Sequence, residues 1–150
     1  MPVDPDLAGR EFPPTAAYDV SRSQIAAFAT AIGDTDPVHH DVDAARAAGH
    51  ADVVAPVTYP IVVAFRAMRA LLEDPEVGID LRHVIHADQR FESLRPVWAG
   101  DSLTARLGVE SLRSMGGSDI IATRTELTGS DGELVCTAYA KLAHTPSEPT

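Results

Sequence analysis

Apolar and polar residues alternate at two different periods along the chain, and the helical period comes first. Four apolar residues after position 21 recur at helical spacing: Ile25, Phe28, Ala29 and Ile32. Ser21, with Gln24 three residues later, has the pattern of a capping box. Gly33 is a typical helix end, because glycine readily adopts the left-handed conformation. These features predict a helix between Ser21 and Gly33.

Two further helices are predicted in the first half. A short one runs over residues 43–49 from an Asp43 cap, and a longer one over residues 58–74 with Thr58 as its cap. The longer helix is apolar on nearly all sides, so it must be surrounded by other structure. Tyr59 and Phe65 are accordingly interpreted as core residues. Its polar positions form one narrow strip: Arg66, Arg69 and Glu73.

The second half of the chain follows the period of a β-strand. In residues 83–94 one face of the strand is expected to be exposed to solvent. The other face is expected to be inward-facing and carries Ile85, Ala87, Gln89 and Phe91. Similar runs predict further strands: residues 103–109, 119–127 and 133–143, with an early strand around Tyr18 and Val20. Helices thus precede strands. The expected class is α+β, with an antiparallel sheet wrapped around one long central helix.

Composition narrows the possible functions. The 150 residues suffice for one domain with a real core, spanning 1–150, with ends 1–8 and 145–150 expected to fray. Twelve basic and 22 acidic residues give a net charge of −10, which argues against nucleic acid as a partner. Cys136 is alone, so no internal disulfide forms. With neither a signal peptide nor a membrane span recognised, we expect a cytoplasmic protein without membrane contact.

The segment "GDTDPVHHD", which begins at Gly33, is the richest in candidate chemistry. A metal site is disfavoured, because neighbouring residues in an extended loop point in different directions and His39 and His40 can hardly share an ion. An acid–base pair needs one carboxylate and one imidazole aimed at the same volume, and Asp34 with His39 meets that need if Pro37 turns both inward. Taken alone, such a loop is more often a solvated polar surface.

A resemblance to a known family favours the acid–base interpretation. "AIGDTDPVHHDVDAARAAG" resembles the hydratase motif of the MaoC-like family, in which a Gly-Asp-x-Asn-Pro-x-His loop precedes a short helix. The likeness continues through "HADVVAPVTYP", "VIHADQRFESLRPVWAGDSL" and "DGELVCTAYAKL". It is strongest to actinobacterial MaoC-type dehydratase N-terminal domains, which are related to the 3-hydroxyacyl dehydratase subunits of mycobacterial type II fatty-acid synthesis. The resemblance implies a hot-dog fold.

The resemblance also implies an activity. It suggests an R-specific enoyl-thioester hydratase or 3-hydroxyacyl-thioester dehydratase, a hydro-lyase acting on acyl-CoA or acyl-carrier-protein thioesters without a cofactor or metal. Asp34 and His39 would hold one water between them as the catalytic pair. The backbone N–H of Val57 would stabilise the thioester oxyanion. Thr58 and Tyr59, which follow it, are the substrate-binding candidates.

Two departures from the motif keep alternatives open. Asp36 replaces the usual Asn and is expected to raise a proton affinity near Asp34, and Pro56-Val57-Thr58 replaces the family's His-Gly-Met. Some relatives are catalytically silent subunits that bind the acyl chain in a heterodimer. A thioesterase on the same fold is a third reading. Family members join edge to edge, so we expect a homodimer, with a heterodimer of two MaoC-like chains as the alternative.

Overall fold

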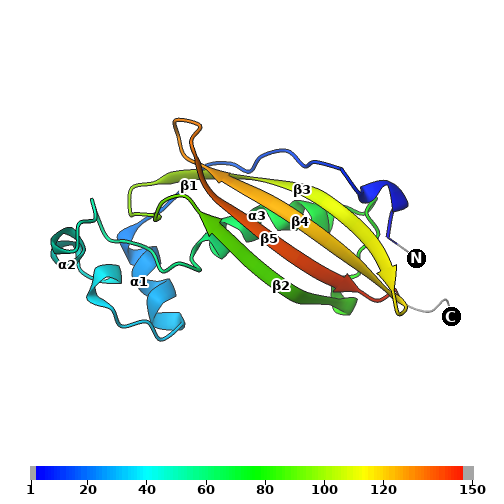
Figure 1. Cartoon of the computed structure of the whole chain (residues 1–150), viewed down its shortest axis with the longest axis horizontal. Coiled ribbons are helices and arrows are strands. Elements are labelled where there is room, and N and C mark those ends of the chain that lie inside the picture. Colours follow the sequence, from blue (N-terminus) through cyan, green and yellow to red (C-terminus); the bar gives the residue numbers. More distant parts are fainter. Residues whose placement is uncertain (1–2, 147–150) are drawn as a thin grey trace.

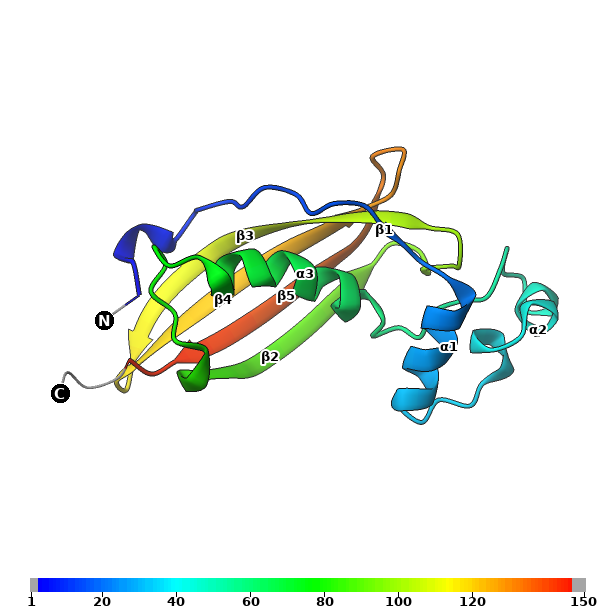
Figure 2. The ribbon, with the colours of Figure 1, turned by 180° about the vertical axis from the view of Figure 1, so that it is seen from behind.

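A computed structural model describes residues 3–146, in which five strands form one antiparallel sheet of order β1-β3-β4-β5-β2. The strands are β1 (Tyr18–Asp19), β2 (Val84–Ser93), β3 (Ser102–Met115), β4 (Ser118–Thr128) and β5 (Leu134–His144). The sheet is curved, and the long helix α3 (Pro60–Glu73) lies along its concave face (Figures 1 and 2). The expected α+β class with a hot-dog arrangement is confirmed.

The core lies between α3 and the concave face of the sheet. The helix contributes Val63, Ala64, Ala67, Met68 and Leu71, and the strands contribute Leu103, Leu107, Ile121, Leu127 and Leu142, all buried. The side of α3 that faces away from the sheet is open, and Phe65 on it is 45% exposed. The prediction that Phe65 belongs to the core is therefore wrong. The sheet covers only one side of a helix that is apolar on most sides.

The helix boundaries follow their capping residues. Helix α1 (Arg22–Ala31) begins with the predicted capping box of Ser21 and Gln24. Helix α2 (Val42–Ala47) is capped by Asp41, whose carboxylate accepts two backbone N–H groups, and not by Asp43. Helix α3 begins at Pro60 without a side-chain cap, so Thr58 does not have the expected role. Proline at the first helical position needs no acceptor for its nitrogen, and that makes a cap less necessary.

A β-bulge at Ala87 corrects the expected faces of β2. Gln89 and Phe91 lie beside Ala140 and Ala138 of β5 on the inner face, as predicted. The register shifts between His86 and Asp88, and an extra residue moves the preceding side chains to the opposite face. Ile85 therefore lies on the outer face and is 67% exposed.

The two edges of the sheet differ. Beyond β1, the N-terminal segment runs along β3 (Figure 2), with hydrogen bonds from the N–H groups of Gly9, Phe12 and Thr15 to carbonyl groups of β3 at 2.8, 2.9 and 2.9 Å. Residues 3–8, expected to fray, include a 3₁₀ turn in which Leu7 is fully buried. Residues 1–2 and 147–150 lie outside the described part. The opposite edge, β2, has no covering segment within residues 3–146.

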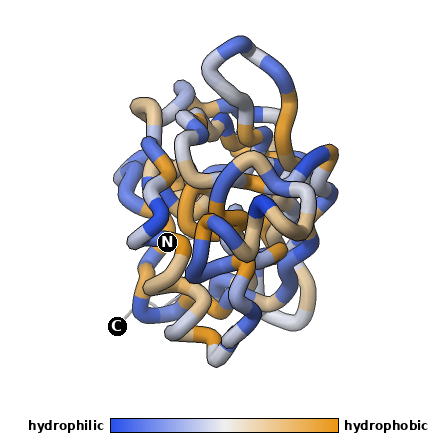
Figure 3. The backbone as a smooth tube through the Cα atoms, turned by 90° about the vertical axis from the view of Figure 1, so that its left-hand side faces the viewer, coloured by the Kyte–Doolittle hydropathy of each residue, from blue (hydrophilic) through white to orange (hydrophobic). Residues whose placement is uncertain are grey.

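The hydropathy of the chain changes at short intervals. Seen from the end that carries α1 and α2, hydrophobic and hydrophilic positions alternate along the backbone tube (Figure 3). Within residues 3–146, no helix has both the length and the apolar character needed to cross a membrane.

Candidate active site

The segment between α1 and α2 is a rigid double turn. Gly33 takes the left-handed conformation with φ of 76°, and the N–H of Asp34 donates to the carbonyl of Ala29 at 2.8 Å. The Oδ1 atom of Asp34 accepts the N–H of Asp36 at 3.1 Å, and Oδ1 of Asp36 accepts the N–H of Val38 at 3.2 Å. These two successive turns lead into a 3₁₀ turn, Pro37–His39. One carboxylate oxygen of Asp34 is thereby fixed, and Oδ2 remains for chemistry.

His39 is held from the other side by the segment before α3. Its Nδ1 lies 2.6 Å from the carbonyl oxygen of Val54, and the ring is buried. A carbonyl oxygen only accepts, so Nδ1 carries a proton and donates it. The N–H of Val54 in turn donates to the carbonyl of Val38 at 3.2 Å. Both backbone groups of Val54 thus set the orientation of His39.

Asp34 and His39 meet at the atoms that these contacts leave free. Nε2 of His39 lies 3.1 Å from Oδ2 of Asp34. Since Nδ1 already carries a proton, a neutral ring and an ionised carboxylate would place two lone pairs opposite each other. One proton shared between the two atoms removes that repulsion. The sequence prediction that these two side chains converge is consistent with this geometry.

His40 points elsewhere. Its ring is exposed, and Nε2 donates to the backbone carbonyl of Asp34 at 3.0 Å. The two adjacent imidazoles thus bond different backbone carbonyls, as expected from their alternating directions. His40 also braces the turn that carries Asp34, which was not anticipated.

Asp34 and His39 lie on the wall of a cavity of about 720 Å³. Most of the wall is apolar: Ile32, Val38, Val54, Val57, Leu94 and Val97. Asp36 and His50 are further polar residues of the wall. An apolar cavity with a few convergent polar groups is the usual form of a small-molecule site.

The three candidate residues just before α3, Val57, Thr58 and Tyr59, lie in different surroundings. Val57 and Thr58 both line the cavity, and within residues 3–146 the N–H of Val57 has no hydrogen-bond acceptor. Tyr59 does not line it: this side chain is 1% exposed, and its hydroxyl lies 3.2 Å from that of Tyr18. Burial, as the largest cause, raises the pKa of Tyr59. The core interpretation of Tyr59 is confirmed, and the structure does not bring it to the cavity of Asp34 and His39.

Several wall residues were missed from the sequence. His50 lines the same cavity as Asp34 and His39, and Ser93 at the end of β2 with residues 94–97 after it supplies another part of the wall. Arg95 in this segment is held by Asp101 at 2.9 Å and by Glu133 at 2.8 Å. These positions are far apart in the chain and have no shared spacing, so no local pattern could have grouped them.

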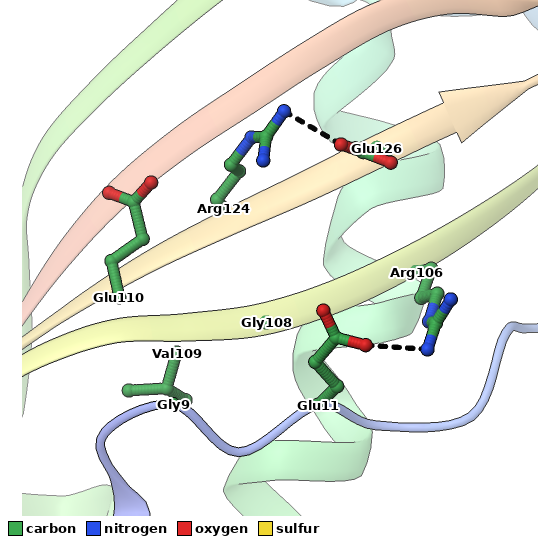
Figure 4. A pocket seen from close by; sticks show the side chains of 8 residues that line it. All are labelled: Gly9, Glu11, Arg106, Gly108, Val109, Glu110, Arg124 and Glu126. Atoms are coloured by element: carbon green, nitrogen blue, oxygen red, sulfur yellow. Dashed lines mark hydrogen bonds and ion pairs between the residues drawn. The ribbon is translucent and has the colours of Figure 1, made fainter.

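A second cavity, of about 370 Å³, lies on the outer face of the sheet (Figure 4). Arg106 pairs there with Glu11 at 2.5 Å, and Arg124 pairs with Glu126 at 2.7 Å. Each arginine on this wall already has an acidic partner, and the wall carries no histidine. We therefore place the candidate chemistry in the cavity of Asp34 and His39.

Known proteins share both the sequence and the fold. A family model described as "FAS1-like, dehydratase domain region" matches residues 6–138. A UPF0336 protein of Streptomyces griseus is 45% identical over 148 residues, which cover 99% of this chain and 99% of that protein. One chain of the truncated HadBC (3R-hydroxyacyl-ACP dehydratase) complex from Mycobacterium tuberculosis matches with a TM-score of 0.84 and 34% identity, covering 92% of this chain and 97% of that chain.

A more distant structure shares the fold. The (R)-hydratase of A. caviae involved in PHA biosynthesis gives a TM-score of 0.67 at 23% identity, over 93% of this chain and 96% of that one. The family model covers most of the chain, and the HadBC chain agrees with it in sequence and in fold. The chain therefore belongs to the FAS1-like dehydratase-region family, among the MaoC-like hot-dog dehydratases.

Proposed function

We propose that this protein catalyses the reversible addition of water to the double bond of a 2-enoyl thioester, which forms an R-3-hydroxyacyl thioester. The observation that carries the proposal is the 3.1 Å contact between Asp34 Oδ2 and His39 Nε2 on a mostly apolar cavity wall. Both atoms are oriented by backbone groups before substrate arrives, which general acid–base catalysis requires. Relatives described as a 3R-hydroxyacyl-ACP dehydratase and an (R)-hydratase support this choice of reaction.

The shared proton gives the reaction a balanced path. In hydration, the carboxylate of Asp34 takes a proton from water as the water oxygen bonds to Cβ. His39 gives its Nε2 proton to Cα, so the pair again holds one proton when the step ends. Because both groups act from one wall of the cavity, OH and H reach the same face of the double bond. Dehydration is the same path in reverse.

The thioester oxygen becomes negative when water adds to Cβ. Val57, whose N–H has no acceptor within residues 3–146, lines the cavity just before α3, where the N-terminus of the helix contributes a favourable dipole. This N–H is the proposed oxyanion donor, and Thr58 beside it is the proposed neighbouring contact. No cofactor is assigned in this scheme, and the substrates are acyl-CoA or acyl-carrier-protein thioesters.

Purified protein tests the proposal directly. Crotonyl-CoA and a longer 2-enoyl-CoA are incubated with the protein. Hydration is measured as the disappearance of the conjugated enoyl thioester. The 3-hydroxyacyl product should be the R isomer. Release of free CoA thiol is measured in the same samples, since thiol release without hydration would indicate a thioesterase. Formation of the S isomer would contradict the proposed site geometry.

A catalytically silent acyl-binding subunit is the second candidate. Three exposed apolar side chains line the active-site cavity, Ile32 at 51%, Val57 at 83% and Leu94 at 71%. Exposed apolar groups of this kind are typical of an interface, and the related HadBC and ChsH1-ChsH2 structures are complexes. Because Asp34 and His39 are both present, we propose an active homodimer. Activity that appears only after a second MaoC-like chain is added would favour the silent subunit instead.

A further inference from the structure

His50 is a polar residue of the active-site cavity that the proposed reaction does not use. It follows the short helix α2, and its backbone N–H donates to the carbonyl of Ala45 at 3.0 Å. Its side chain is half-buried and lines the same cavity as Asp34 and His39. The question is what its ring can offer to a bound substrate.

Trp98 decides which ring nitrogen of His50 carries the proton. The indole Nε1 of Trp98 lies 3.1 Å from Nδ1 of His50. Indole N–H is a donor only, so Nδ1 must be unprotonated and the proton of the neutral ring lies on Nε2. His39 has the opposite arrangement, with its proton on Nδ1. One cavity therefore holds one imidazole whose Nε2 faces a carboxylate and one whose Nε2 is a neutral N–H donor.

The partner of His50 is itself firmly placed. The backbone of Trp98 pairs with Val54, the residue that orients His39, and its N–H donates to Asp101 at 2.8 Å. The guanidinium of Arg95 lies 5.1 Å from the centre of the indole ring. The tautomer of His50 is thus set by a group fixed to the same backbone segment as the acid–base pair.

The Nε2–H of His50 has no acceptor within residues 3–146. Its chemistry suits a neutral acceptor, because Asp34 and His39 with their shared proton are neutral as a pair, Asp36 adds a carboxylate to the wall, and the nearby cation Arg95 is engaged by Asp101 and Glu133. A phosphate would meet net negative charge there. A carbonyl oxygen, by contrast, accepts one hydrogen bond from a neutral imidazole at no electrostatic cost.

We propose that the Nε2–H of His50 binds an amide carbonyl of the arm that carries the thioester, and so positions the acyl group over Asp34 and His39. This inference rests on the proposed function, in which the thioester oxygen itself is bound by the N–H of Val57. Apart from the thioester oxygen, the strongest neutral acceptors of a pantetheine-type arm are its amide carbonyls. The proposal makes His50 a determinant of specificity for amide-bearing thioesters.

Two matched substrates test it. The S-crotonyl thioester of N-acetylcysteamine has one amide in its arm, and S-ethyl crotonothioate has none. His50→Ala should lower the preference for the amide-bearing thioester, measured as the ratio of the two kcat/KM values, about tenfold, the factor expected for one lost hydrogen bond. The change should appear mainly in KM. His50→Gln, which keeps an N–H donor, should recover part of the preference. An equal loss on both substrates, or no loss, overturns the inference.

A binding measurement separates this inference from the proposed reaction. Trp98 is the only tryptophan in the chain and contacts His50, so its fluorescence can report ligand binding. The probe is the saturated S-butyryl thioester of N-acetylcysteamine, which cannot be hydrated. His50→Ala should weaken binding of this probe about tenfold more than it weakens binding of S-ethyl thiobutyrate, which has no amide. Circular dichroism verifies that the variant is folded. If wild-type protein hydrates nothing but shows this difference, the reaction is wrong and the role of His50 stands. Equal binding of both probes by wild type contradicts the role of His50.

Discussion

Asp34 and His39 each have one atom bound to the backbone and one atom free for chemistry. The N–H of Asp36 holds Oδ1 of Asp34, and the carbonyl of Val54 holds Nδ1 of His39. Asp36, expected to perturb Asp34 as a second carboxylate, uses one oxygen to cap the turn before His39. At the scale of single residues, the candidate site therefore consists of the proposed catalytic pair and the backbone groups that orient it.

Removing either member of the pair should stop catalysis without unfolding the chain. Asp34→Asn keeps an acceptor for the N–H of Asp36 but cannot take a proton, and His39→Gln keeps a donor but cannot transfer one. Each should lower kcat for enoyl-CoA hydration by ~10²-fold or more. Asp41→Asn is the matched control, since Asp41 caps α2 outside the cavity and Asn caps equally well. Variants that hydrate at the parent rate would show that the pair is wrongly assigned.

Asp36 should matter for stability through its hydrogen bond. Asp36→Ala removes the acceptor for the N–H of Val38 and should lower the free energy of unfolding by about 1 kcal/mol, as for other lost caps. Asp36→Asn retains that acceptor and should unfold at nearly the parent urea concentration. If both variants lose the same amount of stability, the carboxylate charge matters and the cap does not.

At the scale of elements, the end of β2 and the end of β5 carry different features. The connection after β2 supplies part of the wall of the active-site cavity. The end of β5 carries His144, which is 1% exposed and lies opposite Asp119 of β4. Its Nε2 accepts the N–H of Asp80 at 3.1 Å, and Nδ1 has no hydrogen-bond partner within the described residues. Burial is the main cause that lowers the pKa of His144 below its ordinary value of 6.5, and the nearby Asp119 opposes this shift.

This buried histidine makes stability depend on pH. Because its pKa is lowered, the folded protein binds a proton at His144 only at a lower pH than the unfolded chain, which binds one as pH falls through 6.5. The unfolded state then holds more protons, so this contribution is complete above that pH and is lost below it. Urea unfolding at about pH 7.5 and about pH 5.5 measures the loss. His144→Gln keeps an acceptor for Asp80 and should show a smaller difference between the two pH values; an unchanged difference would assign the effect to other groups.

At the scale of the whole molecule, the sheet has one covered edge and one open edge. The N-terminal segment bonds along β3, whereas within residues 3–146 no segment pairs with the outer edge of β2, a strand of ten residues that carries the exposed Ile85 (Figure 1). Only one lysine, Lys141, is present in the chain to discourage edge pairing. The cavity is lined by Ser93, the last residue of β2, and by residues 94–97 directly after it. Pairing through β2 would therefore satisfy the edge and bring a second chain near the active site.

A change on β2 should disrupt this assembly. Light scattering of the parent protein should give about twice the chain mass of 15.9 kDa. Ile85→Lys places a charge on the open edge and should shift the protein toward monomer. Met115→Lys is the matched control, because Met115 is similarly exposed, at 70%, but lies at the end of β3. A parent monomer, or equal behaviour of the two variants, would contradict pairing through β2.

Local patterns in the sequence were sufficient for much of the fold. The capping box at Ser21, the end of α1 before Gly33 and the strands of the second half depend on neighbours a few residues apart, and all are present. The loop from Gly33 to His39 made Asp34 and His39 a possible pair, and the resemblance to the MaoC-like family favoured that interpretation over a solvated surface.

Tertiary structure alone decided the rest. The bulge at Ala87 depends on the register of β2 with β5, and the exposure of Phe65 depends on which side of α3 the sheet covers. The proton positions on His39 and His50 depend on Val54 and Trp98, which lie 15 and 48 residues away. No periodicity relates residues at such separations. Their contacts exist only because α3 and the curved sheet close around a common core, and this places the loop before α2, the segment before α3 and the connection after β2 around one cavity.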